Sequence, residues 1–380
     1  MTTGRRTRVL HIVNNLNYGG MERLVAEIAR RTDGEHFDTH VLVLWYVGHF
    51  GEGLEKFATV HVATPMTKWS MLYPRNLAAQ ISEIAPDVVH IHSGVLYKAS
   101  LASALAGVPY QIYTDHGRQH PEPWLNKMID RRASGRVDVV AAVSDALAER
   151  LSEIVRDASK IRVVYNGVDT ERYTPRQPDA TIRRELSIES SSPIIGSVGR
   201  LELVKGYDVL VAAFARLLRG WTDEPTPVLV LVGEGSERAV LQKLAADLGV
   251  QDSVRFVGWR SDIERLLGEF TVFAMSSHSE GTSVSLLEAM SSGVCPVVTN
   301  VGGNSFVLGS ALSHRLVPPR EPALLSEALV DALRDKPRRE TDAVCARSRV
   351  EATFGLDAMV RQYESIYRQA RAQATTPAPS

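Results

Sequence analysis

Short runs of aliphatic and β-branched residues alternate with helical patterns along almost the whole chain. The run RVLHIVNN at 8–15 precedes a segment in which Met21, Leu24, Val25 and Ile28 keep the i, i+3, i+4, i+7 spacing of an amphipathic helix. Later strand candidates read HVLVLW, DVVHIH, YQIYT, DVVAAVS and IRVVYN. Because these runs are apolar throughout, they predict strands buried on both faces, as in a parallel sheet. Their alternation with helices predicts a doubly wound α/β domain.

The alternation stops near residue 173 and resumes near residue 193. The stretch between gains proline, serine and charge, which favours a linker, placed at 181–192. Beyond it, the segments PIIGSVG, VLVLVGEG, VRFVGW, TVFAM and VCPVVTN repeat the strand pattern. We therefore predict two Rossmann-like domains, 1–180 and 193–352. The expected ligand site is a cleft between them, at the carboxyl ends of the strands.

The end of the chain has its own pattern. FGLDAMVRQYESIYRQA reads as an amphipathic helix, assigned to 353–372. The polar and proline-containing tail 373–380 is expected to be disordered.

Composition narrows the class of protein. The 380 residues are 44% hydrophobic and 23% charged with a net charge of −1, which suits a soluble globular protein. Charge is balanced in both halves, so nucleic-acid binding is not expected. The chain shows neither 18 uninterrupted apolar residues nor a signal-peptide pattern, so we expect a cytoplasmic protein. Cys295 and Cys345 are too few for a metal site and fit a reducing compartment.

The stretch SEGTSVSLLEAMSSG at 279–293 places two carboxylates around the start of a predicted helix. Ser283 is a plausible N-cap, Glu280 precedes it in a loop, and Glu288 lies about a turn and a half into the helix. Side chains lean toward the helix N-terminus, so both acids border the space into which the amides of 281–285 point. Acceptors beside amide donors suit a ligand with hydroxyls and phosphates, such as a nucleotide sugar. The alternative is that Glu280 caps amides and Glu288 is a solvated helix residue.

A second candidate element is GSVGRLELVKGYDVLV, which follows the first strand of the C-terminal half. Arg200 and Lys205 lie in this glycine-punctuated loop before a helix, at a strand's carboxyl end. Two fixed cations there are well placed to neutralise a diphosphate. Solvated loop charges are the alternative interpretation.

In the N-terminal half, Gly19 and Gly20 lie between the first strand and its helix, where a backbone can come close to a ligand. A tight βα turn would explain them equally. In TDHG, Asp115 and His116 end another strand, and His116 is a candidate for the expected cleft, although a lone histidine is more often structural.

Other signals are weaker. In VGEGSER, Gly233 and Gly235 suggest a dinucleotide fingerprint, but Arg238 occupies the place of the third glycine. We see no Asp-x-Asp, histidine cluster or cysteine pair, so no metal and no cofactor beyond a nucleotide sugar is expected. The segment 124–136 mixes Trp124 and Met128 with basic residues; it favours an ordinary solvated helix over contact with an anionic membrane or a phosphorylated acceptor.

Together these motifs resemble a retaining glycosyltransferase of family 4, with the GT-B fold of two facing Rossmann-like domains. The resemblance covers nearly the whole chain, from YGGMERLV through VVYNGVDTERYTP and GSVGRLELVKG to SEGTSVSLLEAMSSGVCPVVTNVGGN. The run Gly281-Thr282-Ser283 departs from the Gly-Phe-Gly of many members, and Phe306 stands where a glutamate is common. The style of the motifs is closest to sugar transferases of polysaccharide assembly.

The resemblance implies roles for the candidate residues. Glu280 would contact the transferred sugar, Glu288 the ribose, and Arg200 with Lys205 the diphosphate, helped by the amides of Gly281, Thr282 and Ser283. The Gly19–Gly20 loop would cover the diphosphate, and His116 would lie near the sugar and the acceptor. Glu280, His116, Arg200 and Lys205 are the implied catalytic residues.

The expected activity is therefore hexosyl transfer, from a UDP-type nucleotide sugar to a saccharide, a lipid-linked or a small-molecule acceptor. A peripheral contact at the inner membrane face would fit a lipid-linked acceptor. Two alternatives stay open from the residues alone: an NAD-linked oxidoreductase and a non-catalytic nucleotide-sugar binding protein.

Overall fold

The computed structural model describes residues 5–65, 73–117 and 123–374. The chain divides into two compact units, Met1–Asn166 with Asp357–Ser380, and Gly167–Leu356. The division after Asn166 lies upstream of the linker predicted at 181–192, and that linker contains a short helix, α7 (Ala180–Glu185). The tail predicted at 373–380 lies, from residue 375, outside the described residues.

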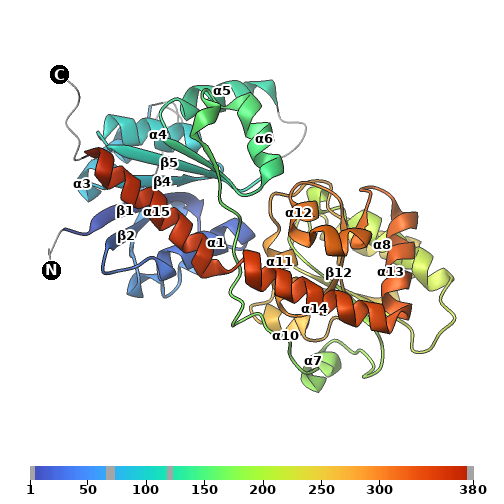
Figure 1. The fold of residues 1–380 in the computed structure, drawn as a ribbon. Coiled ribbons are helices and arrows are strands. Elements are labelled where there is room, and N and C mark those ends of the chain that lie inside the picture. Colours follow the sequence, from blue (N-terminus) through green and yellow to red (C-terminus); the bar gives the residue numbers. More distant parts are fainter. Residues whose placement is uncertain (1–4, 66–72, 118–122, 375–380) are drawn as a thin grey trace. The chain divides into compact units, whose positions relative to one another are not determined.

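The first unit is a parallel seven-stranded sheet in the order β3-β2-β1-β4-β5-β6-β7 (Figure 1). Its strands are β1 (Thr7–Asn15), β2 (Phe37–Tyr46), β3 (Thr59–Val62), β4 (Val88–His92), β5 (Tyr110–Asp115), β6 (Val139–Ala142) and β7 (Ile161–Val163). Its helices are α1 (Gly20–Arg31), α3 (Arg75–Ile84), α4 (Leu96–Leu105), α5 (Trp124–Ser134), α6 (Asp145–Ile154) and α15 (Leu356–Ala374), with 3-10 turns at His49–Gly51, Leu54–Lys56 and Ala158–Lys160.

The second unit is a parallel six-stranded sheet in the order β10-β9-β8-β11-β12-β13. Its strands are β8 (Ile194–Val198), β9 (Val228–Val232), β10 (Val254–Gly258), β11 (Val272–Met275), β12 (Cys295–Thr299) and β13 (Leu316–Val317). Besides α7, its helices are α8 (Tyr207–Arg219), α9 (Arg238–Asp247), α10 (Ile263–Leu267), α11 (Val284–Ser291), α12 (Asn304–Leu308), α13 (Pro322–Arg334) and α14 (Lys336–Thr353), with 3-10 turns at Leu203–Lys205, Gln251–Ser253 and Ser310–Arg315.

Both sheets confirm the predicted doubly wound α/β architecture. The central strands are buried along their length, as the continuous apolar runs required. In each sheet the strand order reverses once, between β1 and β4 and between β8 and β11. Such a reversal opens a crevice at the carboxyl ends of the two strands, where ligands of doubly wound sheets bind.

Helix α15 packs on the sheet of the first unit, although it follows the second unit in the chain (Figure 1). Its apolar face is buried, including Tyr363 and Tyr367. The Tyr367 hydroxyl lies 2.7 Å from His90 Nδ1, and the Glu364 carboxylate accepts a hydrogen bond from the Asp33 amide at 2.9 Å. The helix is therefore fixed to this unit by polar contacts as well as by packing.

The core beneath α15 contains an unusual number of histidines. His11, His90 and His92 are fully buried. Burial lowers the pKa of His11 to about 4, and burial together with the neighbouring rings lowers the pKa of His90 and of His92 well below the ordinary 6.5. The His11 ring is therefore neutral in the folded protein at pH 5, whereas in the unfolded chain all three rings bind protons below about pH 6.5.

We expect the free energy of unfolding to fall as the pH drops from about 6.5 toward 4, because unfolding takes up protons there. His11 alone should remove about 2 kcal/mol between pH 7 and pH 5. The carboxyls whose pKa is lowered in the folded protein, such as those of Asp33 and Asp38, remain ionised in both states down to about pH 5, so they contribute little to the difference between pH 7 and pH 5. Urea unfolding at the two pH values measures the effect. His11→Asn should show a smaller pH dependence, and equal wild-type midpoints at pH 7 and pH 5 would contradict the prediction.

Candidate functional site

The loop after β8 carries both predicted cations. Arg200 is exposed and, within the described parts of the chain, its side chain forms no hydrogen bond or ion pair. Lys205 ends the 3-10 turn Leu203–Lys205, and its side chain is 23% exposed. Gly206 then joins the turn to α8 in a left-handed conformation (φ 59°), and a Cβ there would lie 2.3 Å from the Ser276 carbonyl oxygen. The glycine thus lets the Lys205 backbone lie against the loop that follows β11.

Lys205 and Glu280 are in direct contact. Lys205 Nζ donates to Glu280 Oε1 at 2.6 Å, and Ser277 Oγ donates to the same oxygen at 2.6 Å. The Glu280 side chain is only 8% exposed. Because β8 and β11 are neighbouring strands, the loops after them meet at the point where the strand order reverses. Our reading of the sequence missed Ser277, although its position three residues before Glu280, at the end of β11, was a usable signal.

Backbone packing fixes both loops. Cβ atoms on Gly233 and Gly235 would lie 2.0 Å from the Gly199 oxygen and 2.2 Å from the Leu201 oxygen. These two glycines therefore serve close packing of the loops after β9 and β8, which accounts for them without a dinucleotide fingerprint. A Cβ on Gly302 would lie 1.9 Å from the Glu280 oxygen, so the loop after β12 braces the Glu280 backbone in the same way.

The start of α11 is as predicted. Ser283 is the N-cap, and its hydroxyl accepts a hydrogen bond from the Leu286 amide at 3.4 Å. Gly281, Thr282 and Ser283 are all buried. Glu288, the fifth residue of α11, is 3% exposed, so the alternative of a solvated helix residue is wrong. The buried Glu288 carboxylate and the free amides at the start of α11 thus belong to one short helix. The loop before this helix contains Glu280, which pairs with Lys205.

The remaining predicted residues lie in the first unit. Gly19 is the N-cap of α1 and Gly20 its first residue. The φ of Gly19, 172°, is extended backbone that any residue adopts, and a Cβ there would meet only the flexible Glu22 side chain. The βα turn therefore has no steric need for glycine at this position, so a tight turn alone does not account for Gly19.

His116 follows β5 and is half-buried. Its Nε2 lies 3.1 Å from His92 Nδ1, and its amide donates to Ser93 Oγ at 2.8 Å. Burial lowers its pKa to about 4, with a smaller opposing effect of Asp115. The ring is therefore neutral near pH 7.

The expectation that the chain has no histidine cluster is wrong. His11, His90, His92 and His116 come from β1, β4 and the end of β5, and the parallel pairing of these strands gathers them. Their spacing in the sequence hides the cluster, since only HIH at 90–92 is local. Ring nitrogens of His11, His90 and His92 lie close enough to hold a metal ion. However, both nitrogens of His90 are 2.7 Å from the Tyr367 and Thr114 hydroxyls, so one of these hydrogen bonds would have to break.

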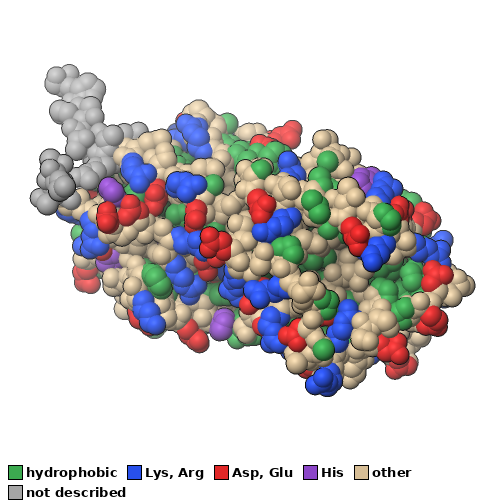
Figure 2. Space-filling view, turned by 60° about the horizontal axis from the view of Figure 1, so that its bottom comes forward, with side chains coloured by type: hydrophobic (Ala, Val, Ile, Leu, Met, Phe, Trp, Pro, Cys, Tyr) green, Lys and Arg blue, Asp and Glu red, His purple; other side chains and the backbone are tan. Residues whose placement is uncertain are grey.

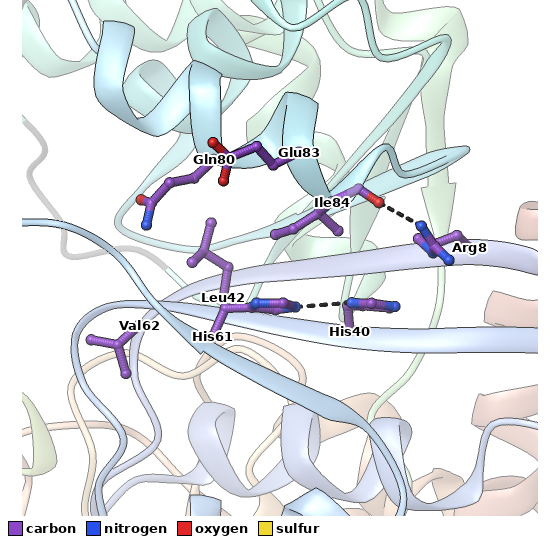
Figure 3. A pocket seen from close by; sticks show the side chains of 8 residues that line it. All are labelled: Arg8, His40, Leu42, His61, Val62, Gln80, Glu83 and Ile84. Carbon is purple, nitrogen blue, oxygen red and sulfur yellow. Dashed lines mark hydrogen bonds between the residues drawn. The ribbon is translucent and has the colours of Figure 1, made fainter.

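Other surface features lie apart from these residues. A pocket of about 340 Å³ lies between α3 and strands β1, β2 and β3 of the first unit; it is lined by Arg8, His40, His61 and Glu83 among others, and contains no predicted site residue (Figure 3). On the face shown in Figure 2, basic and acidic side chains are interspersed. Helix α5 exposes Trp124 (74%) and Met128 (53%). Among the residues described, no helix has the length and apolar character needed to cross a bilayer.

Comparison with known proteins identifies the family of the chain. Residues 18–172 match the family model for Glycosyltransferase Family 4, and residues 178–347 match the model for Glycosyl transferases group 1. The chain is 30% identical over 307 residues to the N-acetyl-alpha-D-glucosaminyl L-malate synthase of Bacillus anthracis, covering 78% of this chain and 79% of that protein. It is 30% identical over 309 residues to the D-inositol 3-phosphate glycosyltransferase of Frankia alni, covering 76% and 75%.

Solved structures show the same fold. The crystal structure of HepE from Anabaena in complex with UDP and glucose matches with a TM-score of 0.83 at 22% identity, covering 96% of this chain and all of that one. Since matching family models span both units and the relatives reach 30% identity over three quarters of the chain, the protein belongs to glycosyltransferase family 4 and has the GT-B fold.

Proposed function

We propose that this glycosyltransferase moves a sugar from a nucleoside diphosphate sugar to an acceptor hydroxyl, with retention of the anomeric configuration. The observation that carries the proposal is the contact between Lys205 and Glu280 at the point where the strand order reverses. The scissile bond joins the sugar to the diphosphate. In this proposal Lys205 binds the diphosphate and Glu280 binds the sugar, so the two side chains have to be adjacent. HepE, a protein of the same fold, has also been solved with UDP-glucose.

In this proposal the cations act on the leaving group. Breaking the bond between sugar and phosphate builds negative charge on the departing diphosphate, and groups already aimed at that charge lower the barrier. Arg200 is exposed and available, while Lys205 is held by Glu280. Arrival of the diphosphate gives Lys205 a second anionic partner, which frees acceptor capacity on Glu280 for the hydroxyls of the sugar.

The acids act on the two sugars of the donor. Glu280 orients the transferred sugar and stabilises positive charge at its anomeric carbon. Glu288, buried in α11, accepts from the ribose hydroxyls, and the amides of 281–283 contact the phosphates. The departing phosphate takes the proton of the attacking hydroxyl, so that the new bond forms on the face from which the leaving group departs. His116 and the Gly19–Gly20 loop contribute from the first unit, and the proposed reaction needs no cofactor besides the donor.

The acceptor class is proposed from the relatives. One curated relative, from Escherichia coli, is named as a galactosyltransferase acting on a diphosphoundecaprenol-linked sugar, and it is 27% identical over 74% of this chain. Saccharide, lipid-linked and small-molecule hydroxyls all suit an enzyme of this kind. UDP-glucose is the first donor to test, followed by a panel of nucleotide sugars in a thermal-shift assay, because a ligand at 100 times its Kd stabilises a protein by about 2.7 kcal/mol.

We expect Arg200→Ala and Lys205→Ala each to lower kcat by about 10²–10³ and to change donor affinity less, because the charge that they stabilise grows in the transition state. UDP release from UDP-glucose, or from the donor found in the panel, measures kcat and KM. Lys243→Ala, which removes an exposed cation of α9, is the matched control. Unchanged turnover at saturating donor would reject the assigned role.

Glu288→Gln should weaken UDP binding by about 1.5–3 kcal/mol, the size of a hydrogen bond to a charged group. Titration calorimetry with UDP measures the affinity. Glu269→Gln is the matched control. Glu269 is as buried as Glu288 and lies in the same unit, but it precedes β11 and its carboxylate accepts a hydrogen bond from Arg183. Equal loss of UDP affinity in both variants would show that Glu288 acts only through stability.

We further propose a peripheral membrane contact through α5, where exposed Trp124 and Met128 accompany Lys127, Arg131 and Arg132. Co-sedimentation with vesicles of phosphatidylcholine and phosphatidylglycerol should fall several-fold in the double variant Trp124→Ser, Met128→Ser. Val344→Ser, an equally exposed apolar position on α14, should leave it unchanged. Wild-type protein that stays in the supernatant would end this proposal.

A further inference from the structure

Three imidazole rings form a continuous hydrogen-bonded chain from the core of the first unit to His116. His11 Nδ1 lies 3.1 Å from His92 Nε2, and His92 Nδ1 lies 3.1 Å from His116 Nε2. The rings of His11 and His92 are nearly parallel, with an angle of 11° between their planes. His11 and His92 are fully buried, and His116 follows β5 at the carboxyl edge of the sheet.

The protons in this chain are coupled. At pH 7 all three rings are neutral, because burial lowers their pKa values, to about 4 for His11 and His116. A neutral ring has one N–H and one bare nitrogen, and each link needs one of each. Only two arrangements satisfy both links. Either every proton points toward His11, which leaves His116 Nδ1 bare, or every proton points toward His116, which gives Nδ1 the proton.

The two ends decide between these arrangements. His11 Nε2 and His116 Nδ1 are both covered from solvent and have no hydrogen-bond partner among the described residues. The first arrangement leaves an N–H of His11 without a partner deep in the core. The second leaves a bare nitrogen there and places the N–H on His116 Nδ1, which has no partner among the described residues either. His116 lies at the carboxyl edge of the sheet, where ligands of doubly wound sheets bind, whereas His11 is fully buried in the core. Only in the second arrangement can an oxygen of a bound ligand accept from the unpaired N–H, which favours that arrangement.

His90 is not part of this chain. Thr114 Oγ1 donates to the Tyr363 hydroxyl at 3.3 Å and therefore accepts from His90 Nε2, while His90 Nδ1 faces the Tyr367 hydroxyl. His90 thus carries its proton on Nε2 independently of its neighbours. Asp115, which also influences His116, is engaged by the Tyr113 hydroxyl and the Gly117 amide. Of the tyrosines of α15, Tyr367 lies against the His11 ring and Tyr363 against the His90 ring.

We propose that His11 and His92 are positioning residues that hold His116 in the tautomer whose Nδ1 carries the proton. His116 then offers a hydrogen-bond donor, and not a base, to an oxygen of the transferred sugar or of the acceptor. The inference rests on the proposed function for the contact of His116 with substrate. It agrees with a reaction in which the departing phosphate takes the proton, because no base is then needed from the protein.

The first test is the tautomer itself. Nitrogen-15 NMR of the protein labelled in its histidine rings, assigned with single variants, should show the proton of His116 on Nδ1 and that of His90 on Nε2. A bare Nδ1 on His116 in the wild-type protein overturns the proposal. This measurement needs no substrate, so it gives its answer even if no donor is turned over. Absence of transfer from every nucleotide sugar would count against the proposed function alone.

The second test uses a pair of variants at His11, which lies far inside the core. His11→Asn keeps an amide donor near the place of Nδ1, whereas His11→Leu is of similar size and has none. Loss of the donor should free the tautomer of His116 and lower kcat about tenfold, the size of one hydrogen bond, with little change in the KM for UDP-glucose. The asparagine variant should restore most of that loss.

A matched control comes from the same sheet. His40 Nδ1 and His61 Nε2 are 2.9 Å apart in a second stacked pair, which lines the pocket of Figure 3 and has no connection to His116. His61→Leu should leave kcat unchanged. Equal losses of kcat in His11→Leu and His11→Asn would show a purely structural role for His11 and overturn the proposal.

Discussion

The candidate site depends on the ion pair between Lys205 and Glu280. Neither side chain is free in solvent, and the Ser277 hydroxyl adds a second donor to the same carboxylate oxygen. Removing the cation would leave a nearly buried carboxylate without its countercharge, which is costly. The pair therefore joins the loops after β8 and β11, at the place where a doubly wound sheet opens toward a ligand. The same two residues therefore hold the loops together and are the ones proposed to bind the donor.

Glycines make this contact possible. Gly206, Gly233, Gly235 and Gly302 each place backbone atoms where a Cβ would lie 2.3 Å or less from a carbonyl oxygen. Real Cβ atoms essentially never come so close, so any side chain at these positions would displace a loop. The four loops after β8, β9, β11 and β12 thus pack backbone against backbone, which fixes the positions of Lys205 and Glu280. Rigid loops keep the charged groups in place before the reaction, so the groups need not reorganise to stabilise charge in the transition state.

Much of this organisation could be predicted from the sequence, because it follows from local patterns. Continuous apolar runs indicated buried parallel strands, and Ser283 before an apolar helix indicated the N-cap. The spacing of Glu280 and Glu288 indicated two acids near one helix start, and membership of the glycosyltransferase family removed the oxidoreductase and the purely binding alternatives. The boundary between the units was predicted less well. We assigned residues up to 180 to the first domain and residues 181–192 to a linker, yet the second unit begins at Gly167, because composition alone does not show which unit a loop contacts.

The histidine chain shows why the rest was hidden. His11, His92 and His116 are far apart in sequence, and each looks like an ordinary core or loop histidine. They meet because β1, β4 and β5 are neighbours in the sheet, and strand order is a property of the whole unit. The position of a neutral imidazole also does not fix its tautomer, because the hydrogen-bond partners of the ring decide which nitrogen carries the proton. A motif can indicate which residue to propose for substrate contact, whereas the proton that His116 would offer in this proposal depends on His92 and His11, on the next two strands of the sheet.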